Sequence, residues 1–582
     1  MIPNVHTPAV ALIVADARDG FMACPTPLDR PLLGRPILHW AMDRAAAVDS
    51  IDSLVILHRG DRPELLPLVE GWRGPKPARA IQHDPPDPYR AMRRVARLWA
   101  PNAWRGGLGG ATCYDELLPV EPWLQALDAC QAPSALLLGA HWPLVDPQLA
   151  QRLLALHLQH PDALQLTFCQ APPGLAPLVL GRKLIEQLQG TDATIGQLLG
   201  YVPTKPQPDP IGRDLCIQVP HTVRDAALRF IPDNPRSRRL LDALARVRGE
   251  RLFTDDAQAI ARAALELGDD FHLAQNTPQQ FTLELTVRRS RSGPFTPQHH
   301  VALDRPDLSP DDARTIIDRI AASPGSVLTL GGAGDPMLHP HWPELVSHAR
   351  RAGIAAVALQ TDLACDEAEL DRLLEAEVDV LSVNLHADKA ATYALTMGPD
   401  EESGAFKRVI AHLERLINAR NRRWQSSTQW SAGVPWILPR MMKTALTLGD
   451  LETFFDRWMH YTRHAVIEPP FTGCGAVPPA PLDARIPQPR RLPCRQASGI
   501  RAAGGRMTIL CDGRVPHCDE DWTGRSTVGD ARHETLDTLW RRLLPSQAHA
   551  PTDTPTDTHR LALCPGCAHW HAAGERVNAG AT

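Results

Sequence analysis

The sequence lacks several features that define common classes of protein. No apolar run approaches the roughly 18 uninterrupted residues that span a bilayer, and Met1–His6 shows no basic region followed by an apolar one. The formal net charge is −5 at pH 7, and 61 Lys and Arg residues are dispersed among 66 Asp and Glu residues, so there is no general basic field for nucleic acid. We therefore expect a cytoplasmic protein that binds neither membrane nor nucleic acid.

Apolar runs and helical patterns alternate through most of the chain. Val10–Ala15, Ser53–His58 and Ala135–Gly139 are short apolar runs typical of buried strands, and Ile37–Ala45 has helical spacing between the first two. This order predicts βαβ units and an α/β fold class. Because 582 residues exceed what one hydrophobic core usually organises, we expect about three or four domains.

Residues 1–240 resemble the nucleotide-sugar and cytidylyltransferase fold, a nucleotidyltransferase (GT-A-like) α/β domain. In that family a loop after the first strand holds a nucleotide, and an Asp after a later strand helps to bind the metal. Here the first loop, Ala17–Gly20 with Pro27–Pro31, has no lysine, and His141 stands where the carboxylate is expected. Neutral imidazole is a poor ligand for Mg²⁺, which disfavours metal-dependent nucleotidyl transfer.

A glycine cluster, Gly106–Gly110, lies in the same region and is followed by Asp115 and Glu116. The cluster is compatible with a nucleotide-binding loop beside acidic residues, but an isolated glycine cluster is more often a flexible turn, which we favour. A charged helix near Arg236–Arg251 then leads onward. We expect residues 241–275 to form a helical linker.

A glycine-rich turn follows a strand in the middle of the chain. Val327–Leu330 runs into Gly331–Pro336, and such a turn lets a ligand approach the backbone closely. This stretch and the later run from Asn384 resemble the radical S-adenosylmethionine superfamily, whose partial βα barrel carries a similar loop that binds the methionyl amine. The resemblance implies a barrel over residues 276–480. It also implies the cofactor-binding residues Gly331, Gly332, Gly334 and Asp335.

One departure from that family changes the expected chemistry. Family members bind the catalytic cluster through three cysteines after the first barrel strand, but Val287–His300 contains no cysteine. Serine and histidine do not replace three thiolates on such a cluster, so we expect no cleavage of S-adenosylmethionine. Arg288, Arg289 and Arg291 instead form a cationic loop, suited to a phosphate or carboxylate or simply solvated.

Five of the twelve cysteines lie in the carboxyl-terminal region. Cys564 and Cys567 have the two-residue spacing that lets one tight turn direct both sulfurs to one metal. Cys494 and Cys518 are the natural partners for a four-sulfur site, while Cys511 follows a predicted strand and can equally face the core. Spacing alone leaves tetrahedral zinc and an iron–sulfur cluster both open.

The same region resembles the SPASM domain, which commonly follows the radical S-adenosylmethionine barrel and carries auxiliary iron–sulfur clusters. Asp512–Val515, Gly529–Asp530 and Leu536–Trp540 carry the resemblance together with the cysteines. It implies a SPASM domain over residues 481–582 and a [4Fe-4S] cluster, with zinc as the alternative metal. The implied ligands are Cys494, Cys518, Cys564 and Cys567. The whole architecture resembles the spiro-SPASM type of protein.

Two functions from different classes remain open at this point. The first is an iron–sulfur protein whose barrel binds or modifies a peptide or small metabolite without cleaving S-adenosylmethionine, with a possible electron-transfer partner. The alternative is a nucleotidyl- or glycosyltransferase that acts through the front domain, with a structural zinc site at the carboxyl end. The sequence identifies no catalytic residue for either one.

Overall fold

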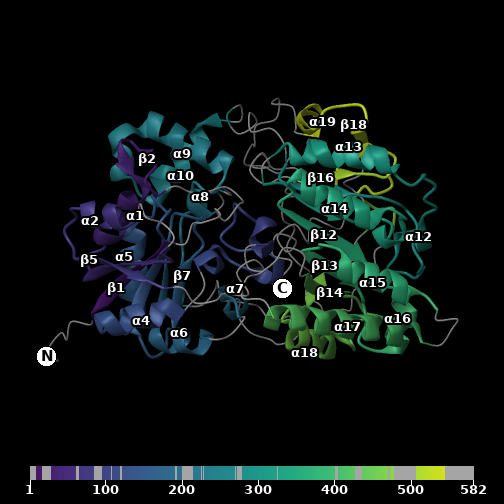
Figure 1. Cartoon of the computed structure of the whole chain (residues 1–582), viewed down its shortest axis with the longest axis horizontal. Coiled ribbons are helices and arrows are strands. Elements are labelled where there is room, and N and C mark those ends of the chain that lie inside the picture. The colour runs from purple at the N-terminus through teal and green to yellow at the C-terminus, as the bar shows by residue number, and fades with distance from the viewer. Residues whose placement is uncertain are drawn as a thin grey trace.

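Two seven-stranded sheets, each with helices packed on it, form the two halves of the computed structural model (Figure 1). The structure describes residues 8–15, 28–60, 65–83, 95–106, 108–117, 121–189, 193–199, 214–224, 226, 228–268, 271, 278–323, 325–399, 404–426, 435–468, 472–477 and 506–543. Most pairs of neighbouring strands are parallel, and the expected α/β class is confirmed.

The first sheet has the strand order β5-β4-β1-β6-β8-β7-β9. Its strands are β1 (Ala9–Val14), β4 (Ser53–His58), β5 (Ala78–Gln82), β6 (Ser134–Gly139), β7 (Leu166–Cys169), β8 (Leu178–Gly181) and β9 (Cys216–Ile217). β1 pairs in parallel with β4 and β6, whereas β8 runs antiparallel to β6 and β7. Because β1 and β6 lie in the middle of the sheet, every residue in them is buried.

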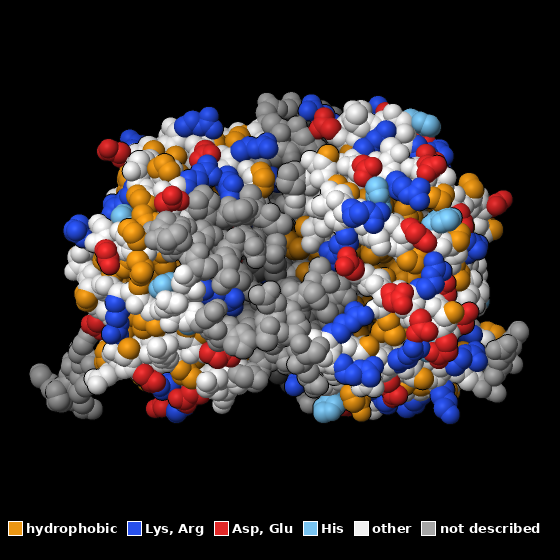
Figure 2. All heavy atoms as spheres, in the orientation of Figure 1, with side chains coloured by type: hydrophobic (Ala, Val, Ile, Leu, Met, Phe, Trp, Pro, Cys, Tyr) orange, Lys and Arg blue, Asp and Glu red, His pale blue; other side chains and the backbone are white. Residues whose placement is uncertain are grey.

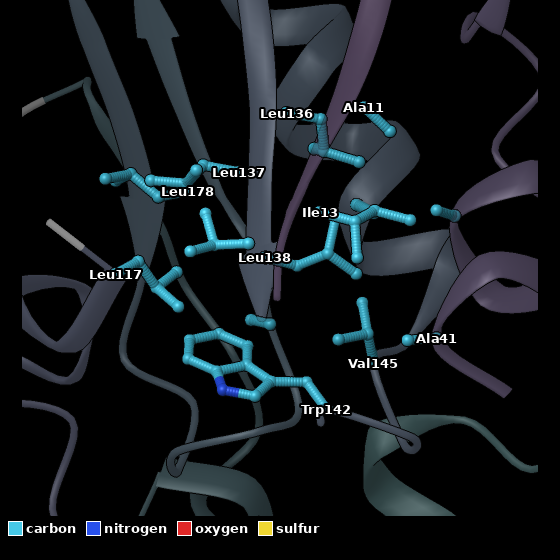
Figure 3. Close-up of a cluster of buried hydrophobic side chains, with 14 of the residues drawn as sticks. Ala11, Ile13, Ala41, Leu117, Leu136, Leu137, Leu138, Trp142, Val145 and Leu178 are labelled. Atoms are coloured by element: carbon cyan, nitrogen blue, oxygen red, sulfur yellow. The ribbon is translucent and has the colours of Figure 1, made fainter. Parts of the chain in front are cut away.

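Helices and a short ribbon complete the first half. They are β2 (Pro31–Leu32), β3 (Arg35–Pro36), α1 (Ile37–Ala46), α2 (Leu65–Gly71), η1 (Leu108–Gly110), η2 (Cys113–Leu117), α4 (Glu121–Cys130), α5 (Pro147–Gln159), α6 (Arg182–Leu188), α7 (Ile195–Leu198), α8 (His221–Arg224), α9 (Pro235–Arg248), η4 (Gly249–Phe253) and α10 (Ala257–Glu266). Figure 3 shows the core at the end of β6, where Trp142 lies among Leu117, Leu138 and Val145.

The second sheet follows the chain order, β15-β14-β13-β12-β11-β10, with β16 on the far edge, and all of its described pairs are parallel. Its strands are β10 (Gln280–Leu283), β11 (Val327–Leu330), β12 (Ala356–Thr361), β13 (Val380–Asn384), β14 (Trp436–Met442), β15 (Val466–Glu468) and β16 (Arg506–Ile509). Sequential parallel strands need a crossover between each pair, and helices supply most of these crossovers.

Those helices, apart from the short α12, share one core with one face of the second sheet. They are α12 (Pro297–His300), α13 (Pro310–Ala321), η5 (Pro336–Leu338), α14 (Trp342–Ala352), α15 (Glu367–Glu375), α16 (Ala390–Met397), α17 (Ala405–Ser426), α18 (Leu451–Thr462) and α19 (Leu536–Leu543). Leu328 and Leu330 of β11 join this core, whereas Val327 joins a different cluster. Because successive side chains point to opposite faces, Val327 marks the face away from the helices, which we call the inner face.

Residues of the first half cover the inner face at the amino ends of the strands. Val95, Ala96, Leu98 and Ala111, which we call the floor residues, form one apolar cluster with this face. The inner-face members are Val327, Ala356, Ala358, Val380, Trp436, Leu438 and Val466. Gln280 Nε2 also donates to the Trp99 carbonyl oxygen at 2.6 Å. The two halves are therefore joined by a packed, apolar contact.

Strand β16 brings part of the expected terminal domain into the second sheet. Met507, Ile509 and Cys511 belong to the same core as the helices, and β17 (Arg514–Pro516) and β18 (Thr527–Asp530) form an antiparallel pair beyond them. Residues 506–543 thus share a core with residues of the expected barrel. The domain boundaries given above stay predictions.

No helix in the described ranges is both long and apolar enough to cross a membrane. On the face of the molecule in Figure 2, Lys and Arg side chains lie among Asp and Glu side chains over both halves. The dispersion of charge in the sequence therefore persists on this surface.

Candidate functional site

The glycine-rich turn Gly331–Pro336 follows β11 and packs directly on the chain that follows β10. Gly332 has a φ of +126°, and a Cβ atom there would lie 2.9 Å from Glu284 Oε2. A Cβ atom on Gly334 would lie 2.0 Å from the Thr286 carbonyl oxygen. Glycine is favoured at Gly332 by its positive φ and the nearby Glu284 side chain, and at Gly334 by the close approach of the Thr286 backbone.

Asp335, the acidic residue of this turn, is buried and holds three donors. Its Oδ1 accepts from the Met337 amide at 3.0 Å, and its Oδ2 accepts from Thr361 Oγ1 at 2.8 Å and from the Asp362 amide at 2.9 Å. Burial, followed by the nearby charge of Asp362, raises the pKa of Asp335 to about 6. Asp335 therefore fixes the ends of β11 and β12 together, and cofactor binding by the turn stays a prediction.

Arg289 places its guanidinium group between these two strand ends. Its Nε donates to the Ala333 carbonyl oxygen at 2.7 Å, and its Nη1 donates to Asp362 Oδ1 at 2.5 Å. The two side chains are 6% and 0% exposed, so solvent hardly screens their charges. Removing either side chain would leave the other charge buried and unpaired, which would destabilise the folded protein.

The other arginines of the predicted cationic loop have different surroundings. Arg288 pairs with Asp307 at 2.5 Å, and its side chain is about half exposed. Arg291 donates to the Gly398 carbonyl oxygen at 2.7 Å and lies over the Tyr393 ring at 5.3 Å. The loop does not present three free cations, and Arg289 is the member that reaches the sheet.

A chain of amides extends from Asp362 along the inner face. Asn384 Nδ2 donates to Asp362 Oδ1 at 2.9 Å, and Gln360 Nε2 donates to Asn384 Oδ1 at 3.2 Å. Asp362 Oδ1 thus accepts two hydrogen bonds. Its Oδ2 is buried and has no hydrogen-bond partner among the residues that the structure describes. The inner face therefore ends in a polar edge with one unused acceptor.

The backbone is strained at two matching positions of this edge. Leu363 and His386 each lie two residues beyond the end of a strand, β12 and β13 respectively, and have φ values of 53° and 52°. Left-handed backbone is unfavourable for such residues and is often kept where a site needs it. The strained positions thus flank the network of Asp362 and Asn384.

His386 is neutral at this edge. Its Nδ1 accepts from the Met442 amide at 3.1 Å, which places the ring proton on Nε2. Burial lowers the pKa of His386 to about 4. On the next strands Arg440 pairs with Glu468, and both side chains are partly exposed. The edge is thus polar across β12 to β15 and less buried toward β15.

Glu284 connects the glycine-rich turn to the carboxyl-terminal residues. Its Oε2 accepts from the Ala333 amide at 2.9 Å, and its Oε1 accepts from Arg305 Nη2 at 2.7 Å and from the Cys511 amide at 3.3 Å. Cys511 is buried, and burial raises the pKa of its thiol to about 12. Cys511 is therefore a protonated core residue here.

Cys518 is the one predicted metal ligand that lies within the described residues. It is half-buried in the turn after β17, with its Sγ 3.8 Å from Asp519 Oδ1. Cys494, Cys564 and Cys567 lie outside the described residues. Within the described ranges, no group of three or more His, Cys, Asp or Glu side chains is arranged to hold a metal ion. The four-cysteine site stays a prediction.

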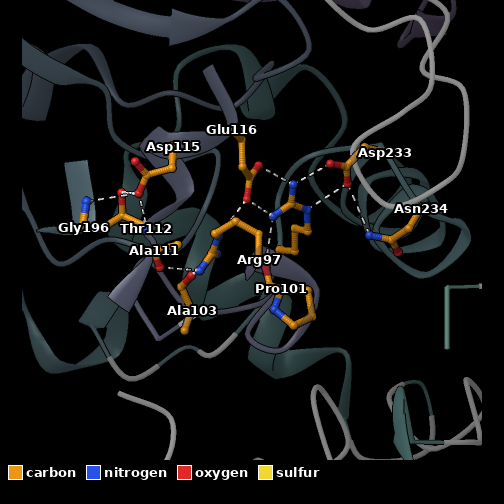
Figure 4. Close-up of polar contacts among 11 residues, drawn as sticks. Arg97, Pro101, Ala103, Ala111, Thr112, Asp115, Glu116, Gly196, Asp233 and Asn234 are labelled. Carbon is orange, nitrogen blue, oxygen red and sulfur yellow. Dashed lines mark hydrogen bonds and ion pairs between the residues drawn. The ribbon is translucent and has the colours of Figure 1, made fainter. Parts of the chain in front are cut away.

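Asp115 and Glu116, the acidic residues that follow the glycine cluster, form hydrogen bonds and ion pairs within the first half (Figure 4). Asp115 accepts from the amides of Thr112, Ile195 and Gly196, and burial raises its pKa. Glu116 binds both Arg97 and Arg229, and all three side chains are at most 1% exposed. Hydrogen bonds and ion pairs already engage the oxygens of these carboxylates.

Other residues considered in the first half also have local roles. Asp146 caps α5 and accepts from the Ala257 amide at 2.8 Å, and His141, in the loop between β6 and α5, is buried. The glycine cluster lies in a loop closed by an antiparallel bridge between Arg105 and Thr112. Leu108 and Ala111 of that loop pack on the second sheet. The turn interpretation of the cluster agrees with this arrangement.

Sequence patterns do not single out Glu284, Gln298 or Asp362. The available signal for Asp362 is its place directly after a buried strand, next to the equivalent position of Asn384 on the following strand. Glu284 follows β10 in the same way. Polar residues at the carboxyl ends of parallel strands are frequent ligand contacts, and this rule applies to Asp362 and Glu284 once the ends of β12 and β10 are known.

Comparisons with known proteins give distant likenesses. No protein-family model matches the chain. A Treponema pallidum (strain Nichols) protein described as uncharacterized is 26% identical over 279 residues, covering 47% of this chain and 74% of that protein. SuiB of Streptococcus suis, bound to the precursor peptide SuiA, is similar at 10% identity with a TM-score of 0.36, covering 49% of this chain and 70% of SuiB. A cytidylyltransferase of Leptospira borgpetersenii is similar at 11% identity with a TM-score of 0.29, covering 45% of this chain and 93% of that enzyme.

Proposed function

We propose that the chain is a cytoplasmic iron–sulfur protein of the SPASM type. Its second sheet is a barrel of radical S-adenosylmethionine type that binds a peptide or small metabolite and does not cleave S-adenosylmethionine. The inner-face edge around Arg289, Asp362 and Asn384 is the ligand site of this proposal.

The surroundings of Arg289 carry the proposal. In the family that the sequence resembles, three cysteines after the first barrel strand bind the catalytic cluster. The corresponding loop, Val287–His300, offers serine, histidine and arginine, and its Arg289 instead forms a buried ion pair with Asp362. These donors do not fit a cluster that needs three thiolates, so the barrel lacks the ligands for reductive cleavage of S-adenosylmethionine. The buried, hydrogen-bonded edge is suited to binding.

The donor set at the carboxyl end does fit a cluster. Four thiolates, from Cys494, Cys518, Cys564 and Cys567, suit a [4Fe-4S] cluster and also tetrahedral zinc. A bound cluster would supply one-electron chemistry and hold the carboxyl-terminal residues together. Cys518 is half-buried and therefore compatible with a ligand role, whereas Cys511 is held in the core beside Glu284.

Metal analysis tests this proposal directly. We would measure iron, sulfide and zinc in anaerobically purified full-length protein, record its visible spectrum, and add S-adenosylmethionine with a reductant. About four irons and four sulfides per chain and no 5′-deoxyadenosine are expected. Zinc alone would remove the iron–sulfur assignment, and formation of 5′-deoxyadenosine would contradict a binding-only barrel.

A double variant assigns the ligands. Cys564→Ala with Cys567→Ala is expected to abolish metal binding and to lower the stability of the carboxyl-terminal residues, because metal binding is coupled to folding. Cys365→Ala is the matched control, since Cys365 is half-buried in the second half and lies 3.9 Å from His412. Unchanged metal content in the double variant would refute the assigned ligands.

A further inference from the structure

We propose that Cys365 is a nucleophilic thiol that His412 deprotonates and Glu367 positions, and that it accepts an acyl group from an uncharged or cationic thioester. Cys365 lies in the loop between β12 and α15, Glu367 is the first residue of α15, and His412 lies on α17. The proposed reaction goes beyond the binding role given above. It depends neither on the inner-face edge nor on the metal of the carboxyl-terminal cysteines.

The central observation is a contact between the thiol and the imidazole ring. Cys365 Sγ lies 3.9 Å from His412 Nδ1, and Glu367 Oε1 lies 3.6 Å from His412 Nε2, the other nitrogen of the ring. A nucleophile, a base and an orienting carboxylate in this order allow a thiol to lose its proton during attack. Such contacts are often long in a protein without substrate and shorten when substrate binds.

The carboxylate of Glu367 favours one protonation state of His412. A carboxylate only accepts hydrogen bonds, so it favours the proton on Nε2 and leaves Nδ1 to accept the proton of the thiol. The Leu363 carbonyl oxygen also lies near Nδ1, but at 3.4 Å it is farther away than in a good hydrogen bond. Glu367 pairs with Arg415 at 2.5 Å and is 72% exposed, so its carboxylate can approach the ring without disturbing the core.

The base is buried, whereas the thiol lies close to the surface. His412 is buried on α17, which packs beside α15 (Figure 1). Cys365 is half-buried, and the three residues that follow it, 366–368, are exposed. An acyl donor can therefore reach this loop from solvent, while the imidazole beside the thiol is shielded from water.

The protonation state of the thiol explains why a neighbouring base matters. Burial, followed by the negative charge of Asp335, raises the pKa of Cys365 to about 12, and Asp366 raises it further. The free thiolate is therefore scarce at neutral pH. Attack at neutral pH requires that the proton leave the sulfur as the new bond forms, and His412 Nδ1 is placed to accept it.

The charges around the thiol define the class of acyl donor. Glu369 also raises the pKa of the Cys365 thiol, but it pairs with Arg372 at 2.5 Å. Asp335 and Asp366 act on the thiol in the same direction. A negative local field repels an anionic donor and tolerates an uncharged or cationic one.

The acyl-transfer step balances without an oxidant or a further reactant. Cys365 Sγ attacks the carbonyl carbon of the thioester while its proton moves to His412 Nδ1. The bond from that carbon to the leaving sulfur then breaks, and His412 returns the proton to the leaving thiolate. The products are an acyl group on Cys365 and one free thiol.

Acetylation of the full-length protein by acetylthiocholine, a cationic thioester, tests the proposal. Peptide mass spectrometry after an acid quench measures the acetyl group on each cysteine. Cys365 is expected to react at least about tenfold faster than Cys130, which is also half-buried but whose sulfur contacts Arg79 and Ser53. Absence of acetyl from Cys365, or equal rates at the two cysteines, would overturn the proposed nucleophile.

Acetyl-coenzyme A serves as the anionic donor in the same assay. It should acetylate Cys365 more slowly than acetylthiocholine does, because Asp335 and Asp366 repel it. An equal or faster reaction with acetyl-coenzyme A would overturn the proposed class of acyl donor.

A variant of the base tests its role. His412→Asn should slow the acetylation of Cys365 by about 100-fold at neutral pH. In the unaltered protein the rate should level off near neutral pH, where an imidazole base becomes deprotonated. In His412→Asn it should keep rising with pH, because only the free thiolate then reacts. Identical pH profiles would show that His412 is not the base and would overturn the proposal.

Glu367 lies at the surface, so its substitution tests the positioning role without opening the core. Glu367→Gln should slow the acetylation of Cys365 by about tenfold, because a neutral amide favours the Nε2 proton less. Asp371→Asn is the matched control, since Asp371 also binds Arg415 and is not paired with His412 in the described part of the structure. Melting temperatures of the same samples separate lost reactivity from lost structure. An equal rate loss in both variants would contradict the role of Glu367.

Discussion

Arg288 and Arg289 are neighbours in the sequence but differ in what they contribute. Arg288 is about half exposed and pairs with Asp307, whereas Arg289 is almost fully buried and pairs with Asp362. Exposed ion pairs contribute little to stability, but removing one member of a buried pair leaves an unpaired charge. Arg289 is therefore expected to contribute more to the stability of the fold than its neighbour Arg288.

Substitution of these arginines should separate the two cases. Arg289→Ala is expected to lower the free energy of unfolding by about 3 kcal/mol or more, and Arg288→Ala by less than about 1 kcal/mol. Adding Asp362→Asn to Arg289→Ala should restore part of the loss, because the unpaired carboxylate is then neutral. Urea unfolding measures all three. Similar losses for the two single variants would contradict the buried pair.

Buried histidines should make the protein sensitive to acid. Burial lowers the pKa values of His386 and His157 to about 4, below the value of about 6.5 in an unfolded chain. Between pH 6.5 and 4 the unfolded chain takes up protons on these histidines while the folded protein does not. The free energy of unfolding is therefore highest above pH 6.5 and falls as the pH drops toward 4, by up to roughly 3 kcal/mol for each histidine. Asp335 acts in the opposite direction between about pH 4 and 6, because its pKa is raised.

The variant His386→Asn tests whether His386 causes the loss of stability at low pH. Asn tolerates left-handed backbone and can accept from the Met442 amide, so His386→Asn should fold and show a flatter loss of stability between pH 6.5 and 4. Urea unfolding at several pH values gives the slope. His460→Asn, at an exposed position, is the control and should leave the slope unchanged. An unaltered slope in His386→Asn would show that His386 does not drive the acid sensitivity.

At the scale of elements, each face of the second sheet packs against a different part of the molecule. Side chains such as Leu328 and Leu330 pack on the helices, and alternate residues such as Val327 form the inner face. The inner face is apolar where the floor residues cover it and polar at the edge with Gln360 and Asn384. The loops that follow β10 and β11 then pack on each other at that edge.

The contact between these two loops gives an element-scale prediction. Gly334→Ala would place Cβ 2.0 Å from the Thr286 carbonyl oxygen, and backbone atoms cannot move aside easily. We expect a loss of about 2 kcal/mol or more in the free energy of unfolding. Gly449→Ala, where no atom lies within 4 Å, is the control and should change it by less than about 0.5 kcal/mol. A tolerated Gly334→Ala would contradict the packing of the turn on the chain that follows β10.

At the scale of the whole molecule, the first half closes the inner face of the second. Arg97 lies among the floor residues and donates to Glu116 and to the carbonyl oxygens of Ala103 and Ala111. Arg229 joins Glu116 to Asp233. This buried network fixes the floor residues to the first half, so the two halves should unfold together.

Loss of a floor side chain tests that coupling. Leu98→Ala should lower the free energy of unfolding by about 2–4 kcal/mol, because it opens a cavity between the halves. It should also broaden or split a single calorimetric transition. Leu395→Ala is the control, since Leu395 is 59% exposed. Two separate transitions in the unaltered protein would contradict the coupling.

Much of the secondary structure could be predicted from sequence. Ser53–His58 and Val327–Leu330 match β4 and β11. The helical pattern over Asp311–Ala322 also predicts a helix, and α13 begins one residue earlier, at Pro310. The alternating pattern over Phe281–Thr286 predicts a strand that reaches Thr286, but β10 ends at Leu283, and Glu284 beyond it contacts Ala333 and Arg305. Local periodicity cannot anticipate such a contact between distant residues.

The sequence by itself determined the α/β class, several central strands such as β1, β4, β6 and β11, and the absence of cysteine from Val287–His300, since these follow from local pattern and composition. Tertiary structure alone decided that Arg289 meets Asp362, that Glu284 joins the glycine-rich turn to Cys511, and that the floor residues cover the inner face. The physical reason is that burial and charge pairing depend on residues that are far apart in the chain and come together only in the fold.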